Sequence, residues 1–208
     1  MKAGRKILSL LLAVCMLICM LPTAVFAASN DDYMKVAMLD SGRKYFTVDW
    51  VKSFIYEAKA DGYTHVMLAV GNDGMRFLLD DMSLTVNSKT YSSGAVKSAI
   101  QAGNTSYTSA STGEWSESEM DEIFAAANAA GIEIIPLLNS PGHMDAVLSA
   151  ASSLTGVTCS YNSSVRTIDV TNTTAVAFTQ AFIQKYIDYF AGKGCKYFNF
   201  GADEYAND

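Results

Sequence analysis

The chain has 208 residues, half of them apolar, and only 17 % of its residues carry a formal charge. This composition lies far from that of disordered chains, which combine low hydrophobicity with high net charge. The formal net charge of −6 argues against a general nucleic-acid-binding protein, because such proteins carry a basic patch or stripe. The length suits one ordinary domain or a part of a larger one.

The first 27 residues have the layout of a secretory signal peptide. Three cations, Lys2, Arg5 and Lys6, precede an apolar run over 7–21, and small residues surround a cleavage position after Ala27. We therefore expect this segment to be removed and the mature protein to be secreted or displayed at the cell surface, with no membrane segment remaining. An uncleaved anchor is the alternative, because the apolar stretch is nearly long enough to span a bilayer.

Removal of this segment leaves 12 Lys and Arg against 21 Asp and Glu, together with two cysteines, Cys159 and Cys195. Two cysteines do not make a disulfide framework: an exported protein permits their pairing, and two buried thiols fit the sequence equally well. The chain has two histidines and neither a CxxC nor an HExxH spacing. We therefore expect no metal and no cofactor.

Strand-like and helical segments alternate along residues 28–208. Short apolar runs that end in polar turn residues predict strands, and apolar residues at helical spacing predict helices between them. Ser116 begins a capping-box pattern, and Gly131 follows the same helix. Two polar stretches interrupt the alternation and are interpreted as elaborated loops, 76–114 and 156–170, the second of them as a short hairpin. The predicted strands cover 36–39, 65–70, 132–138 and 196–200, and the predicted helices cover 48–60, 116–130 and 174–191.

Nearly all-apolar strands that alternate with helices predict a parallel sheet covered by helices. The doubly wound fold and the TIM (β/α)8 barrel share this pattern. Neither GxGxxG nor GxxxxGK[ST] follows a strand, so the usual phosphate-binding signal of the doubly wound fold is absent from the sequence. Polar residues instead follow the carboxyl ends of the strands, where barrels hold their active sites. We predict an α/β fold that comprises about the first four β/α units of a TIM barrel, truncated at the end of the chain.

Two adjacent acids, Asp203 and Glu204, follow the fourth predicted strand. Neighbouring carboxylates disfavour simultaneous ionisation, so we expect one of them to hold its proton near neutral pH. A protonated acid beside an ionised one suits cleavage of a glycosidic bond. Side chains of successive strand residues diverge, however, so the pair cannot act as acid and opposed nucleophile at one anomeric carbon. A glycosidase built on this pair therefore needs another nucleophile.

The strand ends resemble the motifs of glycoside hydrolase family 20, the β-N-acetylhexosaminidases, in the branch that holds bacterial cell-surface hexosaminidases and lacto-N-biosidases. GADE at the fourth strand resembles the catalytic signature of that family, and the resemblance extends over 36–208. Residues 28–208 would then be a partial catalytic domain of this family. The other similar segments are LDSGRKYF at 39–46, IPLLNSPGH at 135–143 and, more loosely, NDGMR at 72–76.

The resemblance implies hydrolysis of terminal β-linked N-acetylhexosamine, or of lacto-N-biose, from glycans. It implies a retaining mechanism in which the 2-acetamido oxygen of the substrate is the nucleophile. Glu204 would be the general acid and base, and Asp203 would orient the acetamido group. Arg43 would bind ring hydroxyls, and His143 would line the pocket or support the acids. A surface arginine and a helix-capping histidine are the structural alternatives for these two residues.

The sequence departs from the family pattern in several places. Asn139 stands where the third-strand motif has an acid, and Ala69 lies near the place of a histidine. The family's later strands bring pocket tryptophans, a tyrosine for the acetamido group and another acid, and we expect these to be missing because the sequence ends at Asp208. We therefore expect the fragment itself to be inactive. Asp40 and Asp73 are interpreted as solvated loop acids and are given no role.

Two other functions remain open. A non-catalytic secreted carbohydrate-binding barrel is favoured if Asn139 marks a relaxed site. A barrel of the family 18 chitinase type would also use the acetamido group, but it would have acids in a D-x-E spacing. The contiguous Asp203 and Glu204 argue against that second alternative.

Overall fold

Four parallel strands form the main sheet and follow one another in chain order. The computed structural model describes residues 33–108, 112–162 and 164–205, so the predicted signal peptide lies outside the described residues. Each neighbouring pair of strands is parallel, which confirms the predicted sheet and its succession of β/α units. The strands are β1 (Val36–Asp40), β2 (His65–Asn72), β6 (Glu133–Ser140) and β7 (Asn199–Gly201), and the short β3 (Gly74–Met75) pairs antiparallel with the end of β2.

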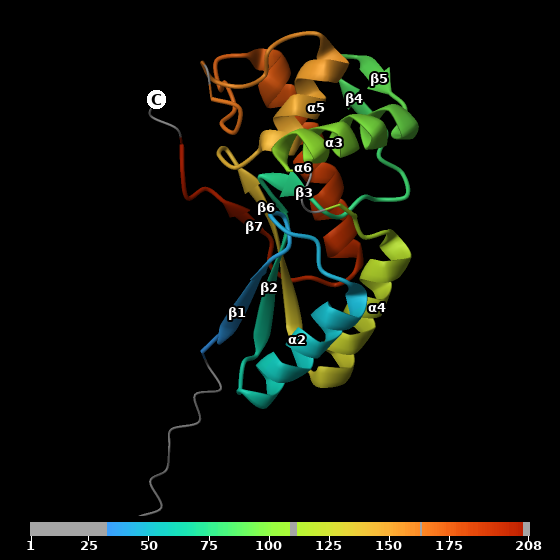
Figure 1. Ribbon diagram of the computed structural model, residues 1–208, viewed down its shortest axis with the longest axis vertical. Coiled ribbons are helices and arrows are strands. Elements are labelled where there is room, and N and C mark those ends of the chain that lie inside the picture. Colours follow the sequence, from blue (N-terminus) through green and yellow to red (C-terminus); the bar gives the residue numbers. More distant parts are fainter. Residues whose placement is uncertain (1–32, 109–111, 163, 206–208) are drawn as a thin grey trace, which may run out of the picture. The chain divides into compact units, whose positions relative to one another are not determined.

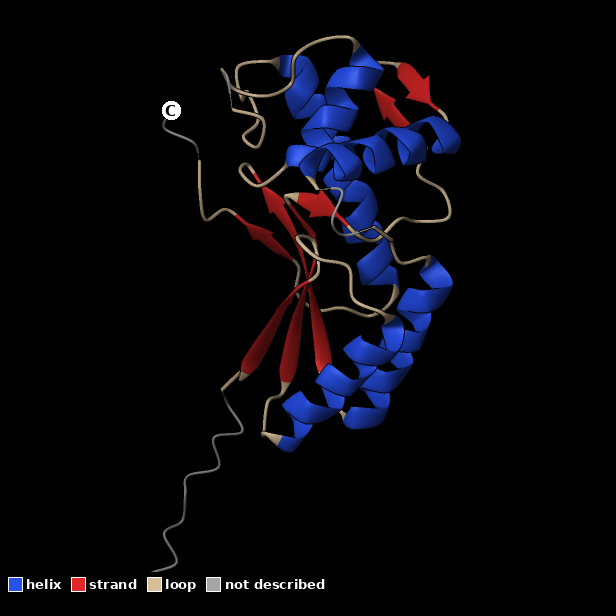
Figure 2. Cartoon of the chain, viewed as in Figure 1, coloured by secondary structure: helices blue, strands red, loops and turns tan. Residues whose placement is uncertain are grey.

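The helices α2 (Val48–Ala60) and α4 (Glu117–Ala130) lie on one side of this sheet, and α3 (Ser93–Tyr107) and α5 (Asp145–Thr155) lie beyond the carboxyl ends of its strands, as Figure 1 and Figure 2 show. Together with α6 (Thr173–Gly192), α2 and α4 confirm the predicted helices. The capping box at Ser116 is present, and Gly131 ends α4 in the left-handed conformation. No helix among the described residues is long and apolar enough to cross a membrane.

The interpretation of residues 76–114 as an elaborated loop is wrong. The segment contains a hairpin, β4 (Leu84–Val86) with β5 (Lys89–Tyr91), and the helix α3 (Ser93–Tyr107). The sequence of α3 is rich in Ser, Gly, Thr and Asn, which are weak helix formers, so propensity does not reveal it. Its stability comes from an N-cap at Ser92 and from packing against a fifth helix, α5 (Asp145–Thr155).

The predicted hairpin over 156–170 is also wrong. Among its described residues, pairing is limited to one isolated bridge between Ser160 and Ile168, with no strand on either side. Backbone bonds tie this segment to the loop after β6 instead: the Ile168 N–H donates to the Pro141 carbonyl at 3.0 Å. The segment therefore serves as a support for the site loop.

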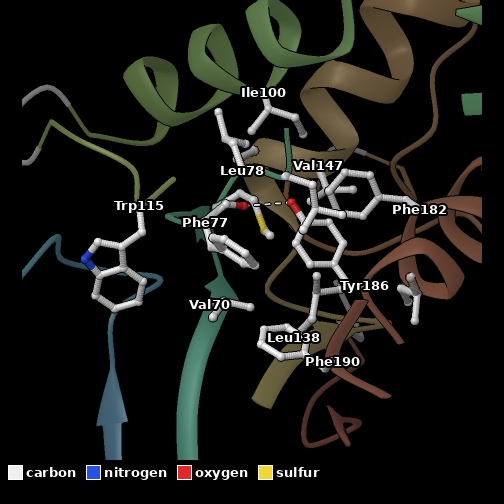
Figure 3. Close-up of a cluster of buried hydrophobic side chains, with 14 of the residues drawn as sticks. Val70, Phe77, Leu78, Ile100, Trp115, Leu138, Val147, Phe182, Tyr186 and Phe190 are labelled. Carbon is white, nitrogen blue, oxygen red and sulfur yellow. Dashed lines mark hydrogen bonds between the residues drawn. The ribbon is translucent and has the colours of Figure 1, made fainter. Parts of the chain in front are cut away.

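Aromatic side chains from distant segments meet in the core (Figure 3). Phe182, Tyr186 and Phe190 of α6 are buried there as part of the core. The Tyr186 hydroxyl donates to the Phe77 carbonyl at 2.7 Å, so the chain after β3 is fixed to α6. Trp115 donates its indole N–H to the Phe46 carbonyl at 2.9 Å and fixes the loop after β1 in the same way.

Both cysteines of the described chain are free thiols. Cys159 is buried and Cys195 is partly buried, as expected for unpaired residues that contribute to packing. Burial raises the pKa of the Cys195 thiol to about 11, which disfavours the reactive thiolate.

Candidate active site

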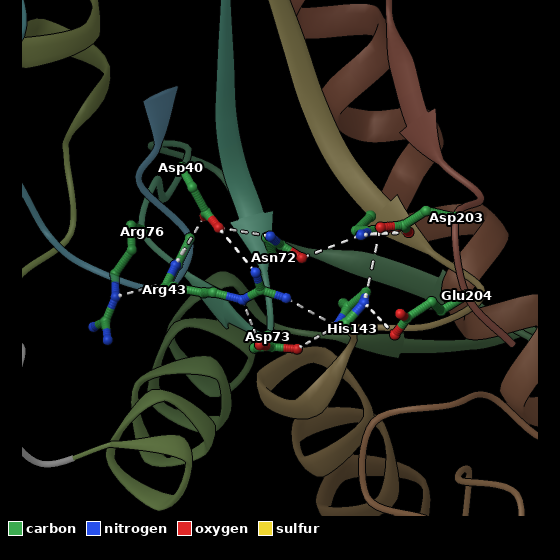
Figure 4. A network of polar contacts seen from close by, with 10 residues as sticks. Asp40, Arg43, Asn72, Asp73, Arg76, His143, Asp203 and Glu204 are labelled. Carbon is green, nitrogen blue, oxygen red and sulfur yellow. Dashed lines mark hydrogen bonds and ion pairs between the residues drawn. The ribbon is translucent and has the colours of Figure 1, made fainter. Parts of the chain in front are cut away.

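The carboxyl ends of the four parallel strands bring the predicted site residues together. Arg43 follows β1, His143 follows β6, and Asp203 and Glu204 follow β7 (Figure 4). Parallel strands in chain order place these loops at one edge of the sheet, where barrel enzymes assemble their sites. A fifth residue, Asp73 in the turn between β2 and β3, lies among them.

A continuous series of polar contacts runs from Arg43 to Glu204. Arg43 donates its Nε–H to Asp73 Oδ2 at 2.8 Å. The other oxygen, Asp73 Oδ1, lies 2.8 Å from His143 Nδ1, and His143 Nε2 lies 3.0 Å from Glu204 Oε2. Asp73 and His143 are buried, whereas the Glu204 side chain is 72 % exposed. A buried acid and a buried imidazole therefore support an acid that is open to a substrate.

Asp73 is ionised within this series. Burial by itself would raise its pKa, but the hydrogen bonds from Arg43 and His143 outweigh burial and hold the pKa of Asp73 below its ordinary value. The hydrogen bond to Asp73 raises the pKa of Arg43 in turn. His143 Nδ1 lies 2.8 Å from Asp73 Oδ1 and 3.3 Å from Arg43 Nη2. An ionised Asp73 can only accept and is the nearer of the two partners, so we assign the ring proton to Nδ1. Nε2 of His143 is then an acceptor that faces Glu204.

A second series of contacts, built from amides, ends at Asp203. Asn139 donates from Nδ2 to Asp203 Oδ1 at 3.0 Å and lies 3.1 Å from Asn72 Oδ1. Asn72 donates to Asp40 Oδ2 at 2.8 Å. Partial burial would raise the pKa of Asp203, but hydrogen bonds from Asn139 and from the backbone N–H groups of Asp203 and Glu204 hold it below its ordinary value. Asp203 is therefore an ionised acceptor.

These contacts correct one interpretation from the sequence and exclude one structural alternative. Asp40 and Asp73 are not solvated loop acids. Asp73 is buried between Arg43 and His143, and Asp40 accepts a hydrogen bond from the backbone N–H of Arg43 at 3.2 Å. His143 is not a helix cap, because the N-cap of α5 is Met144. Asn139 lacks the charge of the family's acid at this position, and its amide donates to Asp203 where an ionised carboxylate could only accept.

The backbone is strained at three of the site loops. Asp73, His143 and Ala202 have φ values of 57°, 53° and 55°, in the left-handed region that non-glycine residues rarely adopt. Each such residue costs on the order of 1–3 kcal/mol and persists where the surroundings fix it, which is common at functional sites. The strain lies beside Glu204 and within the residues that hold it.

Two motif glycines allow the loops to approach each other. A Cβ on Gly142 would collide with the backbone carbonyl oxygen of Glu204. Gly201 has φ 72°, and a Cβ there would collide with the side-chain amide of Asn139. The sequence gives no sign of these contacts, because they join loops about sixty residues apart. The glycines of the PGH and GADE segments thus set the distance between the third and fourth strand ends.

Gly201→Ala is expected to destabilise the protein by about 1–3 kcal/mol, because alanine at positive φ is strained and its methyl group displaces Asn139. Urea unfolding followed by circular dichroism measures the loss. Gly94→Ala in α3 is the matched control, since no described atom lies within 4 Å of the added methyl group there. Equal stability of the Gly201 and Gly94 variants would contradict this account of the contact.

No cluster of three or more His, Cys, Asp or Glu side chains suited to a metal ion occurs within residues 33–108, 112–162 and 164–205. The groups that gather at the strand ends are one cation, one imidazole, several carboxylates and amide donors. This set can move a proton at Glu204 and hold a negative charge at Asp203. Those are the two operations that acid–base cleavage with an internal nucleophile requires.

Comparison with known proteins gives consistent relatives. The lacto-N-biosidase of Bifidobacterium bifidum is 34 % identical over 94 residues, which cover 44 % of this chain and 8 % of that protein. A solved structure of the pneumococcal exo-β-D-N-acetylglucosaminidase StrH has 45 % identity and a TM-score of 0.80, over 84 % of this chain and 43 % of that one. The structure of Dispersin B has 26 % identity and a TM-score of 0.62, over 84 % and 50 % of the two chains.

This chain thus spans half or less of the length of these relatives. The similar structures support the α/β barrel class, of which the described residues contain four parallel strands. The sequence profile of the glycosyl hydrolase family 20 catalytic domain matches residues 35–208. That match covers most of the chain and includes every site residue described above, so this chain belongs to glycosyl hydrolase family 20.

Proposed function

We propose that this chain supplies the acid–base and acetamido-orienting residues of a retaining β-N-acetylhexosaminidase. The observation that carries the proposal is the pairing of two differently held carboxyl groups: Glu204 on the imidazole of His143, and Asp203 on the amide of Asn139. The substrates would be glycans that end in β-linked N-acetylhexosamine or lacto-N-biose. The names of the relatives, a lacto-N-biosidase and an exo-β-D-N-acetylglucosaminidase, support this substrate class.

Glu204 is the proton donor in the first step. Its Oε2 lies 3.0 Å from His143 Nε2, which accepts when Nδ1 carries the proton for Asp73. A protonated Glu204 therefore has a partner for its O–H in the resting site. As the proton passes to the glycosidic oxygen and the C–O bond breaks, the imidazole keeps the new carboxylate in place. In the second step the same carboxylate takes a proton from the attacking water.

Asp203 acts on the 2-acetamido group. Its ionised carboxylate accepts a hydrogen bond from the acetamido N–H, which directs the carbonyl oxygen at the anomeric carbon. That oxygen forms the new bond as the leaving group departs, and the cyclic oxazolinium ion that results is positively charged. Asp203 stabilises this charge until water reopens the ring with net retention. Orientation of an internal nucleophile can contribute roughly 7–11 kcal/mol to the lowering of the barrier.

Arg43 binds the sugar ring from the opposite end of the site. Its Nε is committed to Asp73, and its Nη1 lies 3.5 Å from Asp40 Oδ2, so the guanidinium is fixed in place. The side chain is 46 % exposed, which leaves donor positions free for ring hydroxyls. Asp73 therefore serves both the sugar-binding arginine and the imidazole beside Glu204.

A comparison of substrates with and without the 2-acetamido group tests the proposed function. The full-length protein is expected to hydrolyse an aryl N-acetyl-β-glucosaminide and to leave the matching plain β-glucoside uncleaved, because the plain sugar lacks the acetamido oxygen. The measurement is kcat/KM for the two substrates under one set of conditions. Equal rates on both would rule out substrate assistance.

Binding without turnover is the second candidate function. Its support in the sequence was Asn139, interpreted as the mark of a relaxed site. The hydrogen bond from Asn139 to Asp203 favours hydrolysis over this candidate, because it holds the carboxylate in position for the acetamido group. Binding of an N-acetylated sugar with no hydrolysis by the full-length protein would restore this candidate.

A further inference from the structure

Asp145 is a buried acid behind the site that the proposed mechanism does not use. It is the first residue of α5 and only 9 % exposed. Its Oδ2 is shielded from solvent and has no hydrogen-bond partner among the described residues. Burial disfavours an ionised carboxylate in this position, and a backbone hydrogen bond to Asp145 and the charge of Arg166 are what oppose that effect. The protonation state of Asp145 therefore depends on the groups that surround it.

Asp145 and Asp73 form a pair of neighbouring acids with unequal partners. Both oxygens of Asp73 are engaged, by Arg43 and by His143. The Ala146 N–H donates to the Asp73 carbonyl at 2.9 Å, which holds the start of α5 against the turn between β2 and β3. When two carboxyl groups share a site, the one with the better partners ionises and the other keeps the proton. These contacts assign the negative charge to Asp73.

The groups around Asp145 favour its neutral form. Burial raises the pKa of Asp145, and the negative charge of Asp73 raises it further. The opposing cation is Arg166, which acts from an exposed position on the segment that precedes Ile168. From α3, Tyr107 faces the same cavity of about 250 Å³ that Asp145 lines, and burial raises the pKa of that phenol. A neutral phenol adds no charge to the surroundings of Asp145.

We propose that Asp145 is a positioning residue that stays protonated in the working site, so that Asp73 alone carries the negative charge behind His143. This inference rests on the proposed function for its catalytic consequence. An ionised Asp145 would place a second negative charge behind the imidazole and favour the imidazolium. An imidazolium would draw the proton away from Glu204, which could then no longer protonate the leaving group.

Asp145→Asn tests the proton without reference to activity, since Asn resembles a neutral carboxyl group in shape. Below the ordinary carboxyl pKa, both the folded and the unfolded wild-type chain hold the proton, and the variant should match the wild type. At higher pH the unfolded chain ionises while the folded chain does not, so the wild type loses stability relative to the variant. The urea midpoint of Asp145→Asn should therefore rise relative to that of the wild type between about pH 4 and pH 7.

Asp80→Asn is the matched control, because Asp80 is exposed in the loop after β3, and its offset from the wild type should not grow with pH. The proposal is overturned if the midpoint of Asp145→Asn falls relative to that of the wild type as the pH rises. That result would mean that Asp145 is ionised and stabilised in the folded protein. Failure of the Asn variant to fold would overturn it equally, since a neutral acid must tolerate a neutral isostere.

The pH profile of hydrolysis tests the positioning role. The kcat of Asp145→Asn in the full-length protein is expected to fall less steeply than that of the wild type as the pH rises into the alkaline range. Asp145→Ala, which removes the side chain, should lose activity at every pH. An unmoved alkaline limb in the Asn variant overturns the positioning role. Absence of hydrolysis by the wild type would count against the proposed function, while the comparison of urea midpoints would still decide the state of Asp145.

Discussion

Glu204→Gln is expected to lower kcat for hydrolysis of an aryl N-acetyl-β-glucosaminide by about 10²–10⁴-fold, the usual contribution of a positioned general acid. Gln keeps the shape of the side chain and can contact His143 Nε2, but it has no proton to give to the glycosidic oxygen. KM should change little, because the Glu204 side chain is 72 % exposed and is not a buried structural group. Steady-state kinetics on the full-length protein measures both parameters.

The leaving group distinguishes loss of acid catalysis from general damage. A phenol of low pKa departs without much protonation, so Glu204→Gln should lose less on an activated aryl glycoside than on a natural disaccharide. Glu57→Gln on the exposed face of α2 makes the same chemical change away from the site and should leave kcat unchanged. Equal losses on both leaving groups would mean that Glu204 is not the acid.

Much of the fold could be predicted from the regular spacing of apolar residues along the sequence. The predicted strands and the helices α2, α4 and α6 show apolar faces at regular spacing, and their ends carry local signals such as the capping box at Ser116. The helix α3 has neither strong propensity nor charge pairs, and it is stable because Val96 and Ile100 are buried against neighbouring elements. A contact between segments some forty residues apart leaves no local mark in the sequence.

The residues of the candidate site likewise fall into those that the sequence could predict and one that it could not. Arg43 and His143 could be predicted from their resemblance to the family 20 motifs, and Asp203 and Glu204 also because the pair follows a strand-like run. Parallel strands bring these strand ends together. Asp73 could not, since an Asn-Asp-Gly segment is also typical of an exposed turn. Its burial depends on side chains that arrive from residues 30 and 70 positions away, and those contacts are decided by tertiary packing.

The different states of the two adjacent carboxyl groups have a cause that the sequence alone did not indicate. Mutual repulsion predicts that one of Asp203 and Glu204 keeps a proton, but it does not say which. In the structure the two acids end separate series of contacts: Glu204 meets an imidazole that can accept, and Asp203 meets an amide that donates. The donors at Asp203 hold its pKa low and thereby assign the ionised state to it. Glu204, 3.0 Å from His143 Nε2, is therefore the acid of the proposed mechanism.

Asp203→Asn tests this assignment and is expected to lower kcat by about 10²–10³-fold, the usual cost of losing one preorganised electrostatic contact to a charged transition state. The Asn side chain cannot stabilise the positive charge of the oxazolinium ion, although its carbonyl oxygen can still accept from Asn139 in the place of Asp203 Oδ1. The loss should persist on an activated aryl leaving group, in contrast to that of Glu204→Gln, because it concerns the nucleophile and not the departing oxygen.

Asn139→Asp is the companion variant, because it leaves Asp203 in place and removes only its donor. An acid at position 139 can support Asp203 only when it is protonated, so activity should fall as the pH rises through the titration of the new carboxyl group. The wild type should not show this fall in the same pH range, since Asn139 does not titrate. A flat profile for Asn139→Asp, together with full activity of Asp203→Asn, would show that the amide series ending at Asp203 takes no part in the reaction.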